Sequence, residues 1–249
     1  MAGPTMGAHP GGLPPDLVQG MMQRRGRAHP FADFDPARTA LVVIDMQNAF
    51  VRAGAGHAHC PAAAGIVPAI NGLAGGLRGA GGRIVWIRTT HGPTCRQDWS
   101  VLYDHLIPQS ADRRATSLAP GSAGHALIDD LDIDPADAVI DKFRYSAFLP
   151  GPSDLTQRLQ AEGRDTVMIC GTVTNVCCES SARDAMMLNF TTVMVSDANA
   201  AHSDAAHWAT LTTFYRNFGD VLTTGQILMR LDDLRGQDGA APPRQAGRS

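Results

Sequence analysis

Three residues with reactive side chains follow short apolar segments of this sequence. Asp45 comes directly after the segment LVVI, Lys142 directly after AVID, and Cys177 a few residues beyond TVMIC. A cysteine thiol has an ordinary pKa of about 8.5, and a nearby ammonium group and a helix N-terminus both lower it. Lys142 would supply the ammonium, while Asp45 would accept the thiol proton and pass it to a leaving nitrogen. These residue types predict a cysteine nucleophile that attacks a carbonyl carbon.

Each of the three residues also has an ordinary structural explanation. An aspartate at the end of a strand often caps a turn, and for Asp45 alone that explanation is the better one. A lysine in such a place is usually solvated, and a cysteine in an apolar segment usually fills a core. The coincidence favours chemistry, because core-filling or turn residues have no reason to recur at the same edge of a fold.

Six short apolar segments, rich in β-branched residues, are expected to be strands buried on both faces. They span residues 40–44, 83–88, 138–141, 166–170, 192–196 and, with a weaker pattern, 220–223. Segments with helical spacing alternate with them, at residues 66–77, 155–163, 177–188 and 205–218. This alternation predicts a three-layer α/β/α fold with a mostly parallel sheet of about six strands. Ligands bind at the carboxyl ends of such strands, which is where the three reactive residues fall.

The two ends of the chain differ in composition from the rest. Residues 1–38 contain six prolines and an arginine cluster at 24–27, so we expect an extended or flexible arm. Residues 236–249 (GQDGAAPPRQAGRS) are expected to be a flexible tail for the same reason. Residues 39–235 then form the single folded domain, a length that supports one hydrophobic core.

Composition excludes several classes of function. Apolar residues make up 44% and charged residues 18%, the net charge is −3, and the chain has no basic stripe for nucleic acid. No apolar run is long enough to span a bilayer, and no secretory signal is recognisable, so a cytoplasmic protein is expected. The cysteines are odd in number and form no CxxC pair, which argues against a disulfide framework and a structural zinc site. They are Cys60, Cys95, Cys170, Cys177 and Cys178.

Three segments together resemble the isochorismatase-like cysteine hydrolases, a superfamily that includes nicotinamidase, N-carbamoylsarcosine amidohydrolase and ureidoacrylate amidohydrolase. The segments are ALVVIDMQNAF (40–50), DKFRYSAF (141–148) and ICGTVTNVCCESSARDAMMLNF (169–190). The likeness covers roughly residues 39–230 in consistent order. The run from Gly171 to Cys177, followed by Glu-Ser-x-x-Arg-Asp-Ala, is the specific part of the signal, whereas IDMQ alone would be weak.

The resemblance implies a role for each reactive residue. Asp45 matches the family's general acid and base, Lys142 its lysine, and Cys177 its nucleophile. The family also has a cis peptide bond that corresponds here to Thr172–Val173. It implies an oxyanion hole made by the backbone N–H groups of Val173 and Cys177.

The retained Cys177 also distinguishes subclasses of the family. Isochorismatases proper, which cleave a vinyl ether, generally lack this cysteine. The resemblance therefore implies an amidohydrolase that cleaves the C–N bond of an amide or carbamoyl group through a thioester and releases ammonia or an amine. Vinyl-ether hydrolysis and a non-catalytic interaction protein of the same fold stay open as alternatives.

Four residues are candidates for binding the substrate. Tyr145 would hydrogen-bond the carbonyl end, Phe50 would form an apolar wall, and Arg96 or Arg144 would pair with a substrate carboxylate through a bidentate fork. The alternatives are that Tyr145 and Phe50 pack beneath a loop and that each arginine is a surface charge.

No metal or other cofactor is expected. Nicotinamidases bind a metal through an Asp-x-His pair, and the matching region here, residues 86–91, has none. His57 and His59 form an isolated H-x-H pair, and two ligands are too few for zinc. The expected partners are a small-molecule amide or ureide and other copies of the chain in a dimer or tetramer, with no nucleic acid and no membrane. Cys170 and Cys178 are expected to fill the core.

Overall fold

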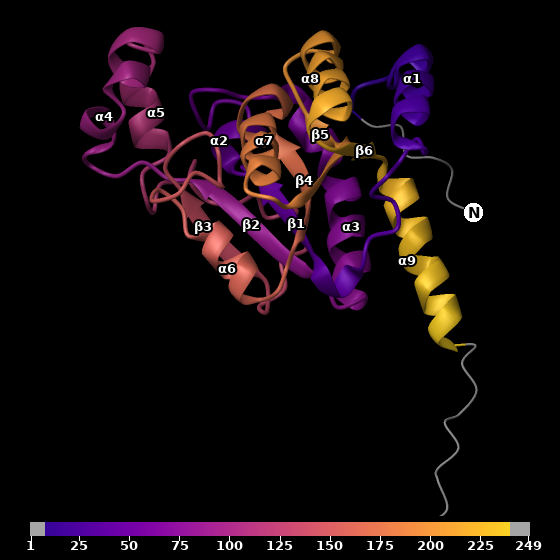
Figure 1. The fold of residues 1–249 in the computed structure, drawn as a ribbon. Helices are drawn as coiled ribbons and strands as arrows, with labels where there is room; N and C mark the ends of the chain where they lie inside the picture. The colour runs from indigo at the N-terminus through magenta and orange to yellow at the C-terminus, as the bar shows by residue number, and fades with distance from the viewer. Residues whose placement is uncertain (1–7, 240–249) are drawn as a thin grey trace, which may run out of the picture.

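The computed structural model describes residues 8–239 and contains one sheet of six parallel strands (Figure 1). The strand order is β3-β2-β1-β4-β5-β6, and every neighbouring pair runs parallel. The strands are β1 (Thr39–Ile44), β2 (Arg83–Thr89), β3 (Ala138–Lys142), β4 (Thr166–Thr172), β5 (Thr191–Ala200) and β6 (Asp220–Leu222). All six predicted strands are confirmed.

The helices and helical turns occupy the segments between these strands. They are α1 (Pro15–Arg25), η1 (Pro36–Arg38), α2 (Asn48–Val51), η2 (Pro61–Ile66), α3 (Val67–Gly79), α4 (Cys95–Asp98), η3 (Val101–Leu106), α5 (Ala111–Ser117), α6 (Leu155–Ala161), η4 (Thr174–Cys178), α7 (Glu179–Met187), α8 (Asp204–Asn217) and α9 (Thr224–Gly239).

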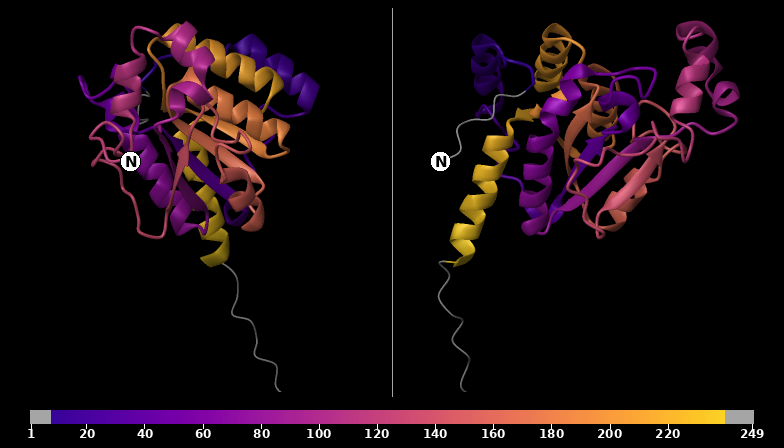
Figure 2. Two further views of the ribbon diagram at one scale, coloured as in Figure 1. Left: turned by 90° about the vertical axis from the view of Figure 1, so that its left-hand side faces the viewer. Right: turned by 180° about the vertical axis from the view of Figure 1, so that it is seen from behind.

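The sheet lies between two helical layers, as the sequence predicts. Side chains of β1 alternate between them: Leu41 and Val43 belong to one core with α3 and α9, whereas Val42 and Ile44 belong to the other with α1, α6, α7 and α8. Such alternation follows from the two-residue period of a strand. Figure 2 shows α9 lying along α3 on the face opposite α7 and α8.

The first part of the chain is folded where an extended arm was expected. Helix α1 packs on α8 and buries Leu17 and Met21 in the core beneath it. Proline is tolerated in the first turn of a helix, so Pro15 begins α1, and the apolar pair four residues apart forms its inner face. The boundary at residue 38 stays a prediction. Of the predicted tail, residues 236–239 are the last turn of α9, and residues 240–249 lie outside the described residues.

The chain changes direction across the sheet between β1 and β4. Strands β2 and β3 extend the sheet on one side of β1, and β5 and β6 extend it beyond β4. At this junction Gly171 has a φ of +113°, and a Cβ there would lie 2.1 Å from the carbonyl oxygen of Ile44. Only glycine permits such a close approach of two backbones. Because ligands bind at this kind of switch point, the junction marks the candidate site.

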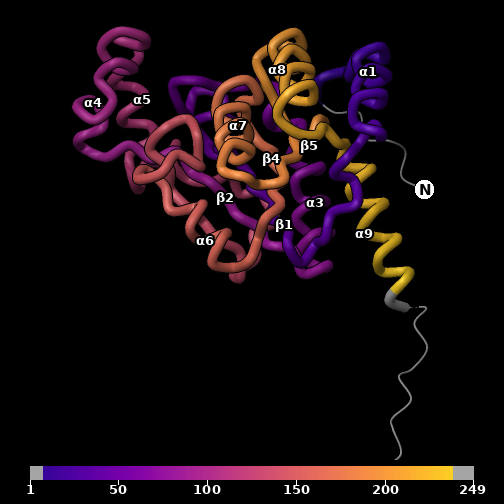
Figure 3. Tube along the Cα trace, in the orientation of Figure 1, coloured from indigo at the N-terminus to yellow at the C-terminus, as the bar shows by residue number. Residues whose placement is uncertain are grey.

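The connection from β2 to β3 makes a long excursion before it returns to the sheet. It carries α4, η3 and α5, which stand beyond the β3 edge in Figure 1, and Figure 3 follows its path. Leu102, Tyr103 and Ala111 form a small core of their own within it. Within residues 8–239, no helix is long and apolar enough to cross a membrane.

Candidate active site

Asp45 follows β1 directly and has an unusual backbone conformation. Its φ of 54° lies in the left-handed region, which residues other than glycine rarely adopt. Its N–H donates to Ile87 O at 3.0 Å, and its side chain is fully buried. Strain of this kind costs about 1–3 kcal/mol and persists where surrounding contacts hold the residue in place. Such a strained conformation indicates that Asp45 has a role other than capping a turn.

Lys142 is the last residue of β3 and the only lysine in the sequence. Its Nζ lies 2.9 Å from Asp45 Oδ2, and both side chains are 0% exposed. Since β2 separates β3 from β1, the lysine side chain reaches across a whole strand to make this pair. Solvated charge, the ordinary explanation for a lysine here, is therefore wrong.

Thr89, at the end of β2, joins Asp45 and Lys142. Its N–H and Oγ1 donate to Asp45 Oδ1 at 3.1 and 2.9 Å, and its Oγ1 accepts a hydrogen bond from Lys142 Nζ. Gln47 holds Thr89 in turn, because its Oε1 accepts from Thr89 N at 2.8 Å and its Nε2 donates to Thr89 O at 3.1 Å. Neither residue was predicted as part of the site. The parallel register places Thr89 opposite Lys142 and so brings it to the site. Gln47 joins the site through its hydrogen bonds to Thr89.

Cys177 lies on the π-helical turn η4, which begins two residues after β4. It is 6% exposed and packs in the core on the α7 side of the sheet. Burial raises the pKa of the Cys177 thiol to about 12; Lys142 acts to lower that pKa, and Asp45 acts to raise it. The expectation of a lowered thiol pKa is therefore wrong for the free enzyme, because desolvation of the thiolate outweighs the ammonium.

The ammonium of Lys142 responds in the opposite direction. Burial alone would lower its pKa, but the charges of Asp45 and Cys177 outweigh burial, and the pKa of Lys142 is raised. The charged form of Lys142 is therefore favoured in spite of its burial, with Asp45 as its ion-pair partner.

The bond between Thr172 and Val173 is cis, as the sequence resemblance implies. Within residues 8–239, the Val173 N–H donates to no backbone or side-chain acceptor. Val173 lies four residues before Cys177, and its N–H group is available to an acceptor from outside the protein. Its assignment to an oxyanion hole with the Cys177 N–H stays a prediction.

Of the four predicted substrate-binding residues, Tyr145 lies near the thiol. The pKa of Tyr145 is raised by burial, with a further upward contribution from Cys177, which places the phenol near the thiol. Phe50 is buried and meets His57 edge-on, with ring centroids 5.6 Å apart.

The other two predicted residues, both arginines, are bound elsewhere. Arg96 pairs with exposed Asp112 at 2.7 Å, and Arg144 donates to the carbonyl oxygens of Phe143 and Asp98. Their proposed role in binding a carboxylate stays a prediction, with Arg144 at the mouth of two neighbouring cavities.

Arg114 of α5, which the sequence analysis did not select, is buried beside the site. It is 6% exposed, and its Nη1 donates to His57 Nε2 at 2.6 Å. Its guanidinium lies 5.7 Å from the centre of the Tyr145 ring. The sequence signal was weak, because an Arg-Arg pair on a helix usually faces solvent.

The cavities that flank the site lie on two sides of the loop after β3. One, of about 160 Å³, is bordered by His91, Cys95 and Phe143, and an open groove of about 550 Å³ is bordered by Trp99, Tyr145 and Ser146. Arg144 borders both. Tyr145 lines the larger of the two, and neither is lined by Asp45, Lys142 or Cys177.

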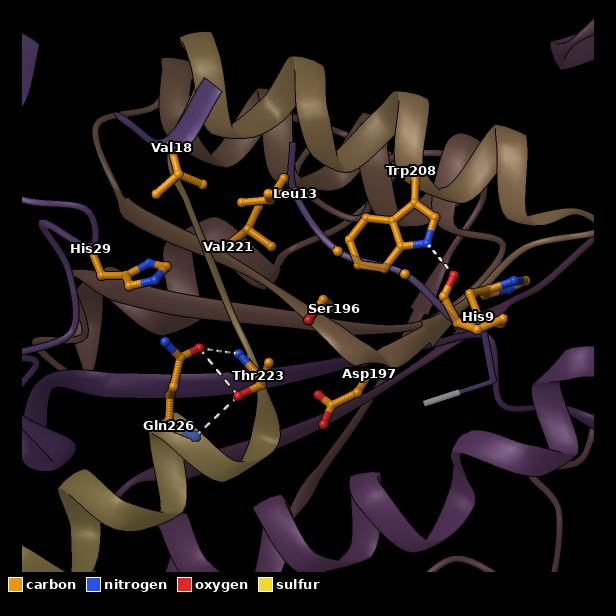
Figure 4. Close-up of a pocket in the computed structure, with 13 residues that line it drawn as sticks. His9, Leu13, Val18, His29, Ser196, Asp197, Trp208, Val221, Thr223 and Gln226 are labelled. Atoms are coloured by element: carbon orange, nitrogen blue, oxygen red, sulfur yellow. Dashed lines mark hydrogen bonds between the residues drawn. The ribbon is translucent and has the colours of Figure 1, made fainter. Parts of the chain in front are cut away.

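A further cavity of about 420 Å³ lies away from this centre, beneath the N-terminal segment (Figure 4). In the close-up, Trp208 Nε1 donates to Pro10 O, and Thr223 and Gln226 are joined by hydrogen bonds. It contains none of Asp45, Lys142 and Cys177, so its size does not make it the reaction site.

The remaining histidines and cysteines have structural surroundings. Burial, and then the charges of Arg114 and Arg113, lower the pKa of His57 to about 3, so it is neutral. Within the described part of the chain, no three His, Cys, Asp or Glu side chains are grouped as metal ligands. Cys170 and Cys178 are 0% exposed in the two cores, which confirms their predicted packing role.

Comparison with known proteins decides the family. Residues 39–226 match the model of the isochorismatase domain. The chain belongs to the isochorismatase family. Among curated members of the isochorismatase family, the ureidoacrylate amidohydrolase RutB of Caulobacter vibrioides is 31% identical over 207 residues, which cover 78% of this chain and 91% of that protein.

Solved structures of the isochorismatase family share the fold. A cysteine hydrolase from Pseudomonas syringae pv. phaseolicola superposes with a TM-score of 0.73 and 32% identity, covering 81% of this chain and 95% of the other. N-carbamoylsarcosine amidase from Thermoplasma acidophilum gives a TM-score of 0.61 and 28% identity, covering 75% and 96%. The protein is thus a hydrolase with the three-layer isochorismatase-like fold.

Proposed function

We propose that this protein is a cysteine-dependent amidohydrolase that cleaves the C–N bond of a small amide or carbamoyl compound. The observation that carries the proposal is the buried Asp45–Lys142 ion pair beside the Cys177 thiol. Asp45 Oδ2 lies 2.9 Å from Lys142 Nζ, and both residues act on the pKa of Cys177, which supports their placement beside the thiol.

The first half of the reaction forms a thioester. Asp45 accepts the proton of Cys177 as the thiolate attacks the substrate carbonyl, so the thiolate exists only while a carbon is there to bond it. The oxyanion accepts hydrogen bonds from the N–H groups of Val173 and Cys177. Asp45 then donates the proton to the leaving nitrogen, and the C–N bond breaks to release ammonia or an amine.

The second half regenerates the enzyme. Asp45, again a carboxylate, takes a proton from a water molecule that attacks the thioester carbonyl. The C–S bond breaks, the acid product leaves, and the proton returns from Asp45 to Cys177. Lys142 stays charged throughout and offsets the negative charge that passes between Asp45, Cys177 and the oxyanion.

The names of the relatives narrow the substrate class. Ureidoacrylate and N-carbamoylsarcosine both carry a carbamoyl group on nitrogen, and both are acids. A carbamoyl acid is therefore the substrate class that we propose first. A dimer or tetramer in the cytoplasm stays part of the same proposal.

The direct test measures ammonia released from carbamoyl acids and simple amides by the wild type and by Cys177→Ala. The wild type should release ammonia, and the variant should lose turnover by several orders of magnitude while its unfolding transition stays close to that of the wild type. Mass spectrometry of acid-quenched wild type should show an acyl group on the peptide that contains Cys177. Near wild-type turnover in Cys177→Ala would exclude the covalent route.

The same panel separates the alternatives. A vinyl ether acid hydrolysed without ammonia, and equally by Cys177→Ala, would indicate the isochorismatase reaction. Absence of hydrolysis of every compound would favour a non-catalytic protein of this fold.

A further inference from the structure

Within residues 8–239, Arg114 is a buried cation without a counter-ion. The residue is 6% exposed, and no carboxylate lies within 4.0 Å of its guanidinium in the described part of the chain. A guanidinium keeps its charge at any physiological pH, and a buried charge is normally paired. The fold therefore holds a positive charge beside the candidate site with nothing from residues 8–239 to neutralise it.

The hydrogen bonds of Arg114 leave one edge of its guanidinium unused. Within residues 8–239, its guanidinium donates from Nη1 to His57 Nε2 at 2.6 Å, and it also lies near Tyr103, whose pKa it acts to lower. Arg114 Nε is buried and has no hydrogen-bond partner in the described part of the chain. Because Nε and Nη2 point to the same side of a guanidinium, the unused edge is the side-on fork that binds a carboxylate through two parallel hydrogen bonds.

His57 fixes the direction in which Arg114 donates. Since burial holds the pKa of His57 near 3, the ring is neutral, and its Nε2 accepts from Arg114 while its Nδ1 carries the proton. Phe50 packs edge-on against the same ring. The arginine is thus anchored by a neutral group that supports its position and leaves its charge available.

The unpaired charge lies next to the reaction centre. Tyr145 connects the two, because its ring lies 5.7 Å from the guanidinium carbon of Arg114 and its pKa responds to both Arg114 and Cys177. Arg114 also acts to lower the pKa of Cys177. Arg114 is therefore close enough to Tyr145 and Cys177 to influence the pKa of both.

We propose that Arg114 binds the carboxylate of the substrate, through the guanidinium edge that His57 leaves unbonded, and so determines specificity for carbamoyl acids over neutral ureas. The inference rests on the proposed amidohydrolase function. It assigns to a residue of α5 the role for which the sequence suggested Arg96 or Arg144. Those two arginines are already bound to Asp112 and to backbone carbonyl oxygens.

The test compares 3-ureidopropionate with N-butylurea, a neutral compound of similar length. In Arg114→Gln, KM for 3-ureidopropionate should rise about 10- to 100-fold, because a charge-assisted bidentate pair is lost, while KM for N-butylurea changes less than about threefold. Arg114→Lys should lie between, since it keeps the charge and loses the fork. Arg113→Gln, an exposed neighbour on α5, is the matched control and should change neither value.

A binding measurement keeps the inference testable apart from turnover. Calorimetry should show that Cys177→Ala binds 3-ureidopropionate with higher affinity than N-butylurea. Adding Arg114→Gln should remove this difference in affinity. Equal affinity for both compounds, no affinity for either, or a preference that survives Arg114→Gln would overturn the role of Arg114. A wild type that binds 3-ureidopropionate through Arg114 but hydrolyses no amide would instead refute the proposed reaction and leave the anion site standing.

Folding is checked in the same variants. Arg114→Gln should keep the far-ultraviolet circular dichroism spectrum of the wild type. If Arg114→Gln fails to fold, Arg114→Lys carries the comparison, and an unchanged ratio of the two KM values in that variant would count against the proposal.

Discussion

Asp45 and Lys142 form the one ion pair in residues 8–239 in which both side chains are completely buried, with Oδ2 and Nζ 2.9 Å apart. The free energy of desolvating two buried charges can exceed the free energy gained from their attraction. The stability of the fold therefore gives no reason for this ion pair to be present. The hydroxyl and N–H of Thr89 supply further hydrogen bonds to Asp45 Oδ1. The arrangement is costly to build, and the reaction proposed above requires it.

Replacing Lys142 by Met should destabilise the protein and change the reactivity of Cys177. The Asp45 carboxylate would be left buried without its partner, which costs about 3–5 kcal/mol of unfolding free energy. Because Lys142 lowers the pKa of Cys177, its removal raises that pKa and moves the iodoacetamide alkylation profile to higher pH. Urea unfolding and alkylation rates measure the two effects. An alkylation profile identical to that of the wild type would remove Lys142 from this role.

Thr89→Val should reduce kcat by about 10- to 100-fold, as the loss of a supporting hydrogen bond commonly does, whereas Thr89→Ser should retain most activity. Valine keeps the shape and removes the hydroxyl that joins Asp45 to Lys142. Lys142 is the only lysine, so lysine labelled with ¹⁵N gives a single ammonium signal in NMR spectra. That signal should shift in Thr89→Val and return in Thr89→Ser. A shift in neither variant would show that Thr89 does not orient the ammonium.

Gly171→Ala should be far more destabilising than Gly163→Ala, although both glycines have a positive φ. An added Cβ at Gly171 would lie 2.1 Å from Ile44 O, whereas Gly163 has open space around it. The conformational penalty alone is about 1–2 kcal/mol, and the clash at the β1–β4 junction adds to it. Chemical unfolding of both variants gives the comparison. Equal losses would mean that β1 and β4 can separate at little cost.

Met21→Ala should lower stability, while the adjacent Met22→Ala should have almost no effect. Met21 is 4% exposed in the core beneath α1, and Met22 is 54% exposed. Truncating a buried methionine costs about 2–5 kcal/mol of unfolding free energy. The same contacts predict that deleting α1 lowers the melting temperature, which an extended or flexible arm would not do. A deletion variant with the melting temperature of the wild type would show that α1 adds nothing to the fold.

The free energy of unfolding should fall as the pH drops below the ordinary histidine pKa. Burial lowers the pKa of both His91 and His207 to about 3, from an ordinary value of 6.5. The two neutral histidines therefore make their full contribution to the free energy of unfolding above pH 6.5. That contribution is lost as the pH falls toward 3, by at most about 1.4 kcal/mol per pH unit for each histidine. Urea unfolding across this range should show a shallower decline in His207→Gln. Exposed His105→Gln is the control and should keep the wild-type slope.

The sequence by itself determined the architecture and the identity of the catalytic candidates. Strands buried on both faces have continuous apolar runs, and reactive residues placed directly after three such runs must meet at one edge of a parallel sheet. This holds for Asp45, Lys142 and Cys177 because their positions depend on the local pattern and on topology alone.

Only the tertiary structure decided which polar groups surround these three residues. Thr89 enters the site through its register opposite Lys142, and Gln47 through its hydrogen bonds to the backbone of Thr89. Arg114 becomes buried because the excursion between β2 and β3 folds back onto His57. Contacts between segments so far apart in the chain leave no local period or spacing to detect.

The shift of the Cys177 pKa also depends on the tertiary structure. The sequence placed an ammonium and the start of a helical segment near the thiol, and both favour the thiolate. The sequence could not weigh them against desolvation, which depends on how completely the surrounding core encloses the sulfur. That enclosure raises the pKa to about 12. It is a property of three-dimensional packing, and in the proposed mechanism removal of the thiol proton therefore falls to Asp45.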